Sequence, residues 1–253
     1  MIGKIENLDI SLFTAIPSQT SDGDRRSLLA VQRATANWHK EYVYLEVGSH
    51  LGGSIQPHLV DDRCMKIYSI DARPSYQPDD RAPGYIAVYE NNSTKRMLSL
   101  LKNIGQGDIA KIECIDADAS EIQPNRIVKR PQLVLIDGEH TKTAVLSDFQ
   151  FCSKVTGQDG TILFHDFDFI YPAILQICQQ LKKQHRKFLP LKLDDAVFGI
   201  FFNPEIVHSD PYLALLYRKN KRFILKLMVK ERFKNYIKNP FLKLINSVFK
   251  HIN

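Results

Sequence analysis

The stretch YVYLEVGSHLGGS at residues 42–54 joins a β-rich apolar run to a glycine-rich turn. Residues 42–47 have the composition of a buried strand. Gly48 and Gly52 follow, and glycines there let the backbone turn sharply and pass close to a ligand that faces the next helix N-terminus. A merely tight strand-to-helix turn explains them equally well. The dinucleotide form G-x-G-x-x-G is absent because residue 50 is His, which argues against a nicotinamide or flavin enzyme.

Strands and helices alternate along the chain around this stretch. Further strand patterns occupy residues 66–71, 109–115, 132–136 and 161–164, and helical patterns occupy 24–38, 93–104, 143–155 and 171–185. Residues 188–193 and 196–202 predict a closing antiparallel pair. The order predicts an α/β fold, Rossmann-like and doubly wound, with a mainly parallel seven-stranded sheet and an antiparallel closing strand. Ligands of such sheets bind beyond the carboxyl ends of the strands.

The composition is that of an ordinary folded protein: 253 residues, 44% apolar and 25% charged. These values exclude a disordered chain, a collagen-like fibre and a coiled-coil rod. The four cysteines are scattered with no C-x-x-C pair, which excludes a cysteine-rich zinc module and argues against a disulfide scaffold. Residues 1–17 lack the pattern of a signal peptide, and no run is apolar enough to span a membrane. We expect a cytoplasmic protein.

The net charge of +6 belongs to the C-terminal part of the chain. Residues 212–253 carry 11 Lys and Arg against the single Glu231, a net charge of +10, which leaves −4 for residues 1–211. We therefore expect a cofactor-binding domain at residues 1–210 and a basic amphipathic helical tail at residues 211–253, with one helix starting at Pro240.

Two interpretations of this tail remain open. It lies on an anionic membrane surface, which would place the protein at the inner face of a membrane, or it docks on the body or on a second copy of the chain in a homo-oligomer. Nucleic acid is a disfavoured partner, because the body is negative and no nucleic-acid module is recognisable.

Asp71 ends the second strand pattern, about two dozen residues beyond the glycine-rich turn. An acidic side chain there can accept hydrogen bonds from both hydroxyls of a ribose. A lone strand-end Asp is more often a turn or cap residue. Together with the glycine-rich turn, however, Asp71 indicates a cofactor that contains a nucleoside.

Three motifs carry a family resemblance: the loop E-x-G-x-x-x-G-x-S at residues 46–54, the segment 114–119, and I-D-G-x-H at residues 136–140. With Asp71 they resemble class I S-adenosylmethionine-dependent methyltransferases, and more narrowly the macrolide-sugar O-methyltransferase and cephalosporin-hydroxylase-like group. The resemblance spans residues 24–202. It implies methyl transfer from S-adenosylmethionine to a hydroxyl of a small-molecule or glycan acceptor, a sugar or glycosylated metabolite. A non-sugar acceptor and an inactive cofactor-binding or scaffold protein are the alternatives.

The resemblance also implies roles for residues in these motifs. Glu46 and Gly48 would border the methionine end of the cofactor, within the loop that also holds Ser49, Gly52 and Ser54. Asp71 would hold the ribose, Asp118 and Ala119 would flank the adenine, and Asp137 would lie at the same edge. For Asp118, the N-cap of a short helical turn is an equal alternative.

A metal site is expected where two strands end in acids. Asp137 and Asp166 can share one divalent cation, and oxygen ligands suit Mg²⁺. In similar sugar methyltransferases an acidic residue precedes the second Asp and completes the site, whereas this chain has His165. That difference either removes the metal or shifts its preference toward manganese, iron or zinc, with His165 as third ligand. A packing role for His165 is the alternative.

His140 follows Asp137 by three residues, where the resemblance places a histidine near the acceptor hydroxyl. An imidazole that titrates near neutrality suits a general base, so His140 is the expected catalytic residue. Asp148 falls within a predicted helix and is expected to be solvated. The long loop at residues 72–92 is a candidate lid, with Arg81, Tyr85 and Tyr89 as candidate acceptor contacts.

Overall fold

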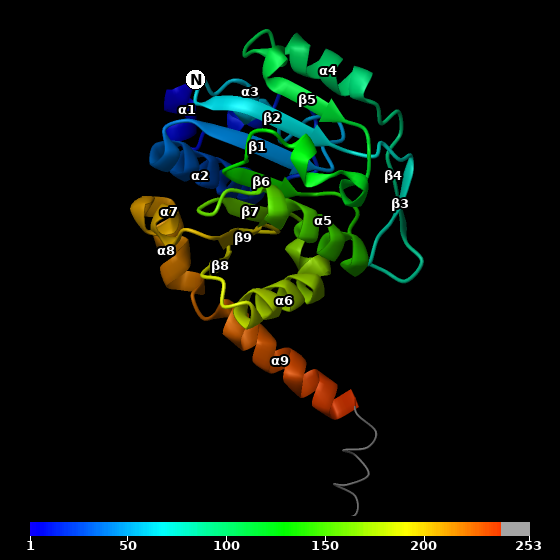
Figure 1. Ribbon diagram of the computed structural model, residues 1–253, viewed down its shortest axis with the longest axis vertical. Coiled ribbons are helices and arrows are strands. Elements are labelled where there is room, and N and C mark those ends of the chain that lie inside the picture. The colour runs from blue at the N-terminus through cyan, green and yellow to red at the C-terminus, as the bar shows by residue number, and fades with distance from the viewer. Residues whose placement is uncertain (239–253) are drawn as a thin grey trace, which may run out of the picture.

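The computed structural model describes residues 1–238, with side chains up to Glu231. A seven-stranded sheet of order β5-β2-β1-β6-β7-β9-β8 forms its centre (Figure 1). The five parallel strands are β1 (Tyr42–Val47), β2 (Cys64–Ile70), β5 (Ile112–Ile115), β6 (Leu133–Ile136) and β7 (Thr161–Phe164). β9 (Phe198–Phe201) pairs antiparallel with both β7 and β8 (Leu189–Lys192). The predicted fold is confirmed.

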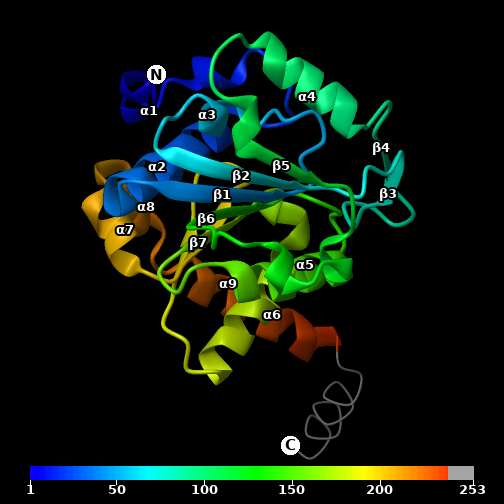
Figure 2. The same cartoon turned by 45° about the horizontal axis from the view of Figure 1, so that its top comes forward.

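Helices cover both faces of the sheet (Figure 2). The helices on one face are α1 (Ile2–Glu6), α2 (Asp22–His39), α3 (Gln56–Leu59), α4 (Thr94–Asn103), α7 (Pro204–Ser209) and α8 (Pro211–Asn220). The other face carries α5 (Lys142–Val155), α6 (Phe167–Lys183) and the first turn of α9 (Phe223–Lys238). β1 is buried along its whole length, with Tyr42 and Tyr44 facing α2 and with Val43, Leu45 and Val47 facing the opposite layer.

Three segments differ from the sequence predictions. β5 begins only at Ile112, because residues 109–111 form a 3₁₀ turn in which the Asp108 side chain accepts from the Ala110 N–H. α6 begins at Phe167, four residues earlier than predicted, because Asp166 takes a left-handed conformation with φ 52° and turns the chain straight from strand into helix. The long loop contains a small hairpin of β3 (Tyr76–Pro78) and β4 (Ile86–Val88).

The beginning of the basic segment packs on the body. Leu213 and Leu216 of α8 are buried in the same core as α2, and Ile224 of α9 is buried in the opposite layer. The predicted helix that starts at Pro240 lies outside the described residues. The two-part division of the chain, the membrane surface and the homo-oligomer stay predictions. No helix within residues 1–238 is long and apolar enough to cross a membrane.

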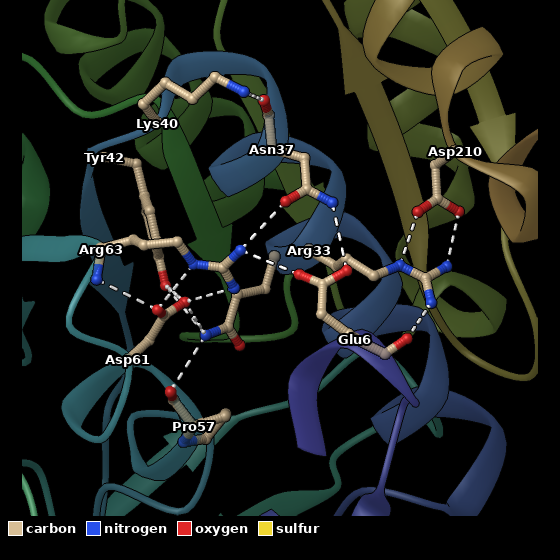
Figure 3. Close-up of polar contacts among 10 residues, drawn as sticks. Glu6, Arg33, Asn37, Lys40, Tyr42, Pro57, Asp61, Arg63 and Asp210 are labelled. Atoms are coloured by element: carbon tan, nitrogen blue, oxygen red, sulfur yellow. Dashed lines mark hydrogen bonds and ion pairs between the residues drawn. The ribbon is translucent and has the colours of Figure 1, made fainter. Parts of the chain in front are cut away.

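A polar network closes the amino-terminal edge of the sheet (Figure 3). Arg33 of α2 donates from Nε and Nη2 to both carboxylate oxygens of Asp210, at 2.8 and 2.9 Å, and donates from Nη1 to the Glu6 carbonyl. Asp210 also accepts from the Tyr212 and Leu213 N–H groups at the start of α8. One carboxylate therefore caps α8 and ties it to α2.

Asp210→Ala is expected to lower the free energy of unfolding by roughly 3–5 kcal/mol, because it leaves a largely buried guanidinium without its carboxylate partner and removes a helix cap. Urea denaturation followed by circular dichroism measures this change. The control is Asp22→Ala, which breaks a solvent-exposed pair with Arg25 and is expected to cost about 1 kcal/mol or less. Equal losses of unfolding free energy in the two variants would show that Asp210 contributes no more to stability than a surface acid does.

Candidate active site

Two adjoining pockets lie at the carboxyl edge of the sheet, and both are lined by Gly48, Asp71, Gln77 and Gly138. Gly48, with φ 89°, permits their depth, because a Cβ there would lie 2.2 Å from the Asp137 carbonyl oxygen. We name the pocket toward β7 the acid pocket; its further lining includes Ser49, Ser54, Tyr89, Asp137, His140, His165 and Asp166. We name the other the apolar pocket; its further lining includes Val47, Ala117, Asp118, Ala119, Ala144 and Asp148.

Asp137, His140 and Asp166 converge in the acid pocket. Asp137 and His140 lie between the end of β6 and Thr141, the N-cap of α5, while Asp166 lies between β7 and α6. One ligand atom from each of these three residues lies within 4.8 Å of the others. Strands β6 and β7 are parallel neighbours, so their carboxyl ends place the two acids side by side as predicted.

His140 is held by the long loop. Its Nδ1 lies 3.0 Å from Oδ2 of buried Asp79, and its carbonyl accepts from the Asp80 N–H at 3.1 Å. Nε2 then faces the acids, 3.1 Å from Asp166 Oδ2 and 3.6 Å from Asp137 Oδ1. Nε2 is nevertheless buried without a well-directed hydrogen bond to any described residue. An imidazole nitrogen that is buried, orphaned and flanked by two carboxylates fits a metal ligand.

His165 lies between carboxylates on both sides. Nδ1 is 3.1 Å from Asp137 Oδ1, and Nε2 is 3.3 Å from Oδ2 of Asp24 at the start of α2. Both ring nitrogens of His165 therefore already have carboxylate partners, and its place as third metal ligand stays a prediction. Among the described residues, Asp137, His140 and Asp166 form a group that could hold a metal ion.

The electrostatics follow from these contacts. Burial lowers the pKa of His140, but the carboxylates of Asp137, Asp166 and Asp79 outweigh it and raise that pKa to about 9. Burial also lowers the pKa of His165, but the carboxylates of Asp137, Asp166 and Asp24 outweigh it and raise that pKa far above its usual range. Burial alone would raise the pKa of Asp137, yet the two histidines lower it well below the usual value. Without another cation, both imidazoles are therefore protonated at neutral pH.

Asp71 lines both pockets and is held in place by backbone groups. Its carboxylate accepts from the His50 N–H at 2.8 Å and from the Arg73 N–H at 2.7 Å. The Arg73 guanidinium lies beside it and also donates to the His50 carbonyl. Asp71 thus fixes the glycine-rich turn and keeps carboxylate lone pairs at the junction of the two pockets.

A family model described as a methyltransferase domain matches residues 45–167, from β1 through the start of α6. Residues 45–167 are a methyltransferase domain. The match contains the glycine-rich turn, Asp71, both pockets and the acid pair. The resemblance to class I S-adenosylmethionine-dependent methyltransferases is confirmed, and S-adenosylmethionine is the cofactor that this family implies.

Similar proteins are found at low sequence identity. An uncharacterised protein of Acanthamoeba polyphaga mimivirus, R132, is 26% identical over 203 residues, 75% of this chain and 81% of its own. The O-methyltransferase NovP superposes with a TM-score of 0.55 at 13% identity, over 72% of this chain and 82% of its own. MycE, a methyltransferase from the mycinamycin biosynthetic pathway solved with Mg and SAH, gives 0.53 at 14% identity, over 79% of this chain and 54% of its own. The solved structures establish the fold.

The predicted cofactor residues of the methyltransferase domain fall into two groups. Most line a pocket: Gly48, Ser49, Ser54, Asp71, Asp137, Asp118 and Ala119. Gly52 and Glu46 line neither. Gly52, with φ 82°, packs against Leu101 of α4, and Glu46 is wholly buried beneath the turn. Asp118 accepts from the Ser120 N–H as the N-cap of a 3₁₀ turn, the alternative left open above.

Sequence reasoning missed several polar residues of the site. Asp24, Arg73 and Asp79 supply the partners of His165, Asp71 and His140. The expectation that Asp148 is solvated is wrong, because it is 5% exposed and lines the apolar pocket. Val145, Phe149 and Cys152 share its buried helix face, so the spacing i, i+3, i+4, i+7 already contained this signal.

Glu46→Gln is expected to flatten the pH dependence of stability. Ser54 Oγ donates to Glu46 Oε1, and the Tyr44 hydroxyl donates to Oε2 at 3.0 Å. Burial raises the pKa of Glu46 to about 8 from an unfolded value of 4.5, so its contribution to stability is complete below pH 4.5 and is lost as pH rises through 8. A neutral amide keeps an acceptor and a donor but cannot titrate.

Urea unfolding of wild type and Glu46→Gln between pH 5 and pH 9 measures the effect. The variant is expected to lose less stability than wild type over that interval. A pH dependence unchanged from wild type would show that Glu46 is ionised in the folded protein.

Proposed function

We propose that this protein transfers a methyl group from S-adenosylmethionine to a hydroxyl oxygen of a sugar or glycosylated metabolite. The observation that carries the proposal is the cluster of Asp137, His140 and Asp166 in a pocket that adjoins the glycine-rich turn. It is supported by relatives of the same fold: NovP is an O-methyltransferase, and MycE has been solved with Mg, SAH and mycinamycin VI.

The chain's own residues suit the cofactor. The Gly48 turn leaves room for close approach, Ser49 and Ser54 offer hydroxyls, and the Asp71 carboxylate would accept from the ribose hydroxyls. Ala119 and the neighbouring alanines give the apolar pocket walls that a planar base can pack against. Bound S-adenosylmethionine would supply the methyl group, and the pockets would align it with the acceptor oxygen.

Asp137, His140 and Asp166 would hold a divalent cation. The orphaned His140 Nε2 fits this role, and the positive charge of a cation would take over the neutralisation of the two carboxylates that the imidazolium provides. Two carboxylates and one imidazole admit manganese, iron or zinc as well as magnesium. When bound, the cation would lower the pKa of an acceptor hydroxyl.

His140 as general base is the weaker of its two roles. An imidazole whose pKa is raised to about 9 already carries its proton at neutral pH and cannot accept another. Its Nδ1 faces Asp79, and its Nε2 faces the acids. The geometry therefore favours His140 as a ligand, with Asp79 as the residue that fixes the orientation of its ring.

The proposed function is tested by calorimetric titration of S-adenosylhomocysteine, followed by a methyl-transfer assay on a panel of glycosylated and non-glycosylated hydroxyl compounds. Asp71→Asn is expected to weaken S-adenosylhomocysteine binding roughly tenfold or more, because it removes charge-assisted hydrogen bonds. The control Asp62→Asn changes an exposed acid on the amino-terminal side of β2 and is expected to bind like wild type.

The outcomes separate the alternatives. Absence of S-adenosylhomocysteine binding by the wild-type protein would reject the proposal. Tight binding with no turnover on any compound would favour the inactive scaffold, and turnover on non-glycosylated compounds alone would reject the sugar acceptor.

The metal site is tested through the orientation of His140. Asp79→Asn is expected to lower Mn²⁺ affinity by roughly 10–100-fold, because it weakens the contact that directs Nε2 toward the acids. Electron paramagnetic resonance of free Mn²⁺ gives the affinity without an activity assay. Asp80→Asn alters the adjacent acid, whose carboxylate accepts from the Lys142 N–H, and is expected to leave Mn²⁺ binding near the wild-type value. A similar loss of Mn²⁺ affinity in both variants would mean that the long loop affects the site only through its overall conformation and not through the contact between Asp79 and His140.

A further inference from the structure

Asp148 of α5 carries a buried carboxyl group that is without a partner. Its side chain is 5% exposed, yet it makes no hydrogen bond or ion pair with any described residue. Other buried acids of the chain are satisfied: Asp24, Asp61, Asp79 and Asp210 all accept hydrogen bonds. Because Asp148 lines a pocket and its carboxyl has no partner among the described residues, the carboxyl is available to a partner from outside the chain.

The position of Asp148 indicates where this partner binds. Asp148 lines the apolar pocket, and a Cβ at Gly138 would lie 3.4 Å from Asp148 Oδ2, so the carboxyl lies across from the glycine that borders both pockets. The lining combines small apolar side chains, Val47, Ala117, Ala119 and Ala144, with the polar Asp71, Gln77, Asp118 and Glu139, and among these acids Asp148 is the most buried. Small apolar walls beside a buried polar group suit a flat heterocycle whose polar edge meets that group.

Asp118, the acid first expected at the adenine, is less suited to this contact. It is exposed, and its Oδ1 accepts from both the N–H and the hydroxyl of Ser120. Its carboxylate is therefore used within its own turn and loses little hydration there. A hydrogen bond to the base is therefore expected to contribute more binding free energy at Asp148, which is buried and has no partner among the described residues, than at Asp118.

We propose that Asp148 recognises the edge of the adenine base of the cofactor, so that base selectivity resides in α5. This inference rests on the proposed use of S-adenosylmethionine. Burial, with smaller contributions from the carboxylates of Asp118 and Glu139, raises the pKa of Asp148 to about 7. In its protonated form the carboxyl group can accept from the exocyclic amine and donate to a ring nitrogen at once, which matches the paired donor and acceptor of adenine, and in its ionised form it can still accept from the amine.

The experiment compares S-adenosylhomocysteine with its N6,N6-dimethyl analogue, which lacks the amine hydrogens. Calorimetry gives both affinities for wild type, Asp148→Ala, Asp148→Asn and the control Asp62→Asn, at an exposed acid outside both pockets. Wild type is expected to bind the analogue roughly tenfold more weakly. Asp148→Ala is expected to bind S-adenosylhomocysteine roughly tenfold more weakly than wild type and to discriminate little between the two ligands.

Asp148→Asn is expected to keep both affinity and discrimination, because its amide offers the same acceptor and donor. Asp62→Asn is expected to bind like wild type. Thermal unfolding serves as the folding control: Asp148→Ala removes no contact within the described chain, so its Tm is expected to stay at or above that of wild type.

The inference would be overturned if Asp148→Ala bound S-adenosylhomocysteine as tightly as wild type does. It would also be overturned if Asp148→Ala bound it more weakly but still discriminated between the two ligands as wild type does. If wild type binds S-adenosylhomocysteine and only these predictions for Asp148 fail, the proposed function still stands. If wild type binds neither ligand, both are rejected.

Discussion

Repulsion among carboxylates is the constraint on which the site depends. Asp24, Asp79, Asp137 and Asp166 all approach the same two imidazoles. Four ionised acids in a partly buried region would repel each other and raise one another's pKa values. His140 lies between Asp79 and the acid pair, and His165 lies between Asp24 and Asp137, so cationic groups separate the acids. The ends of β6 and β7, the long loop and α2 are thereby held to one another by charge.

The second constraint is the close approach of backbones at the centre of the sheet. β1 pairs with both β2 and β6, so ligands entering from the carboxyl edge meet the chain where it leaves β1. Only a glycine at position 48 fits beside the Asp137 carbonyl. The result is a junction between two pockets, one lined by acids and histidines and the other by alanines together with acids. A molecule with a charged end and an aromatic base suits this pair of pockets.

The sequence predicted what depends on local pattern. The strands, the mainly parallel sheet and the meeting of Asp137 with Asp166 follow from hydrophobic runs, alternation and the parallel-sheet rule. The partners of the histidines could not be predicted in this way. Asp24 meets His165 across 141 positions and Asp79 meets His140 across 61, and neither contact has a periodic signal. Asp148 is different, because its buried position was readable from the helix spacing and was assigned to solvent on its charge alone.

The departure from the expected acidic residue at position 165 has a physical reason in Asp24. Asp24 belongs to the capping box of α2, where it accepts from the Ser21 N–H, and it also accepts from the Ala196 N–H. It is therefore fixed opposite position 165, and an acid there would add a carboxylate beside Asp24, Asp137 and Asp166. A histidine there can instead donate from Nδ1 to Asp137 and from Nε2 to Asp24, which uses both of its ring nitrogens. His140 Nε2, in contrast, faces the acid pair, 3.1 Å from Asp166 and 3.6 Å from Asp137. A histidine at position 165 is thus compatible with a cluster of Asp137, His140 and Asp166 that could hold a cation.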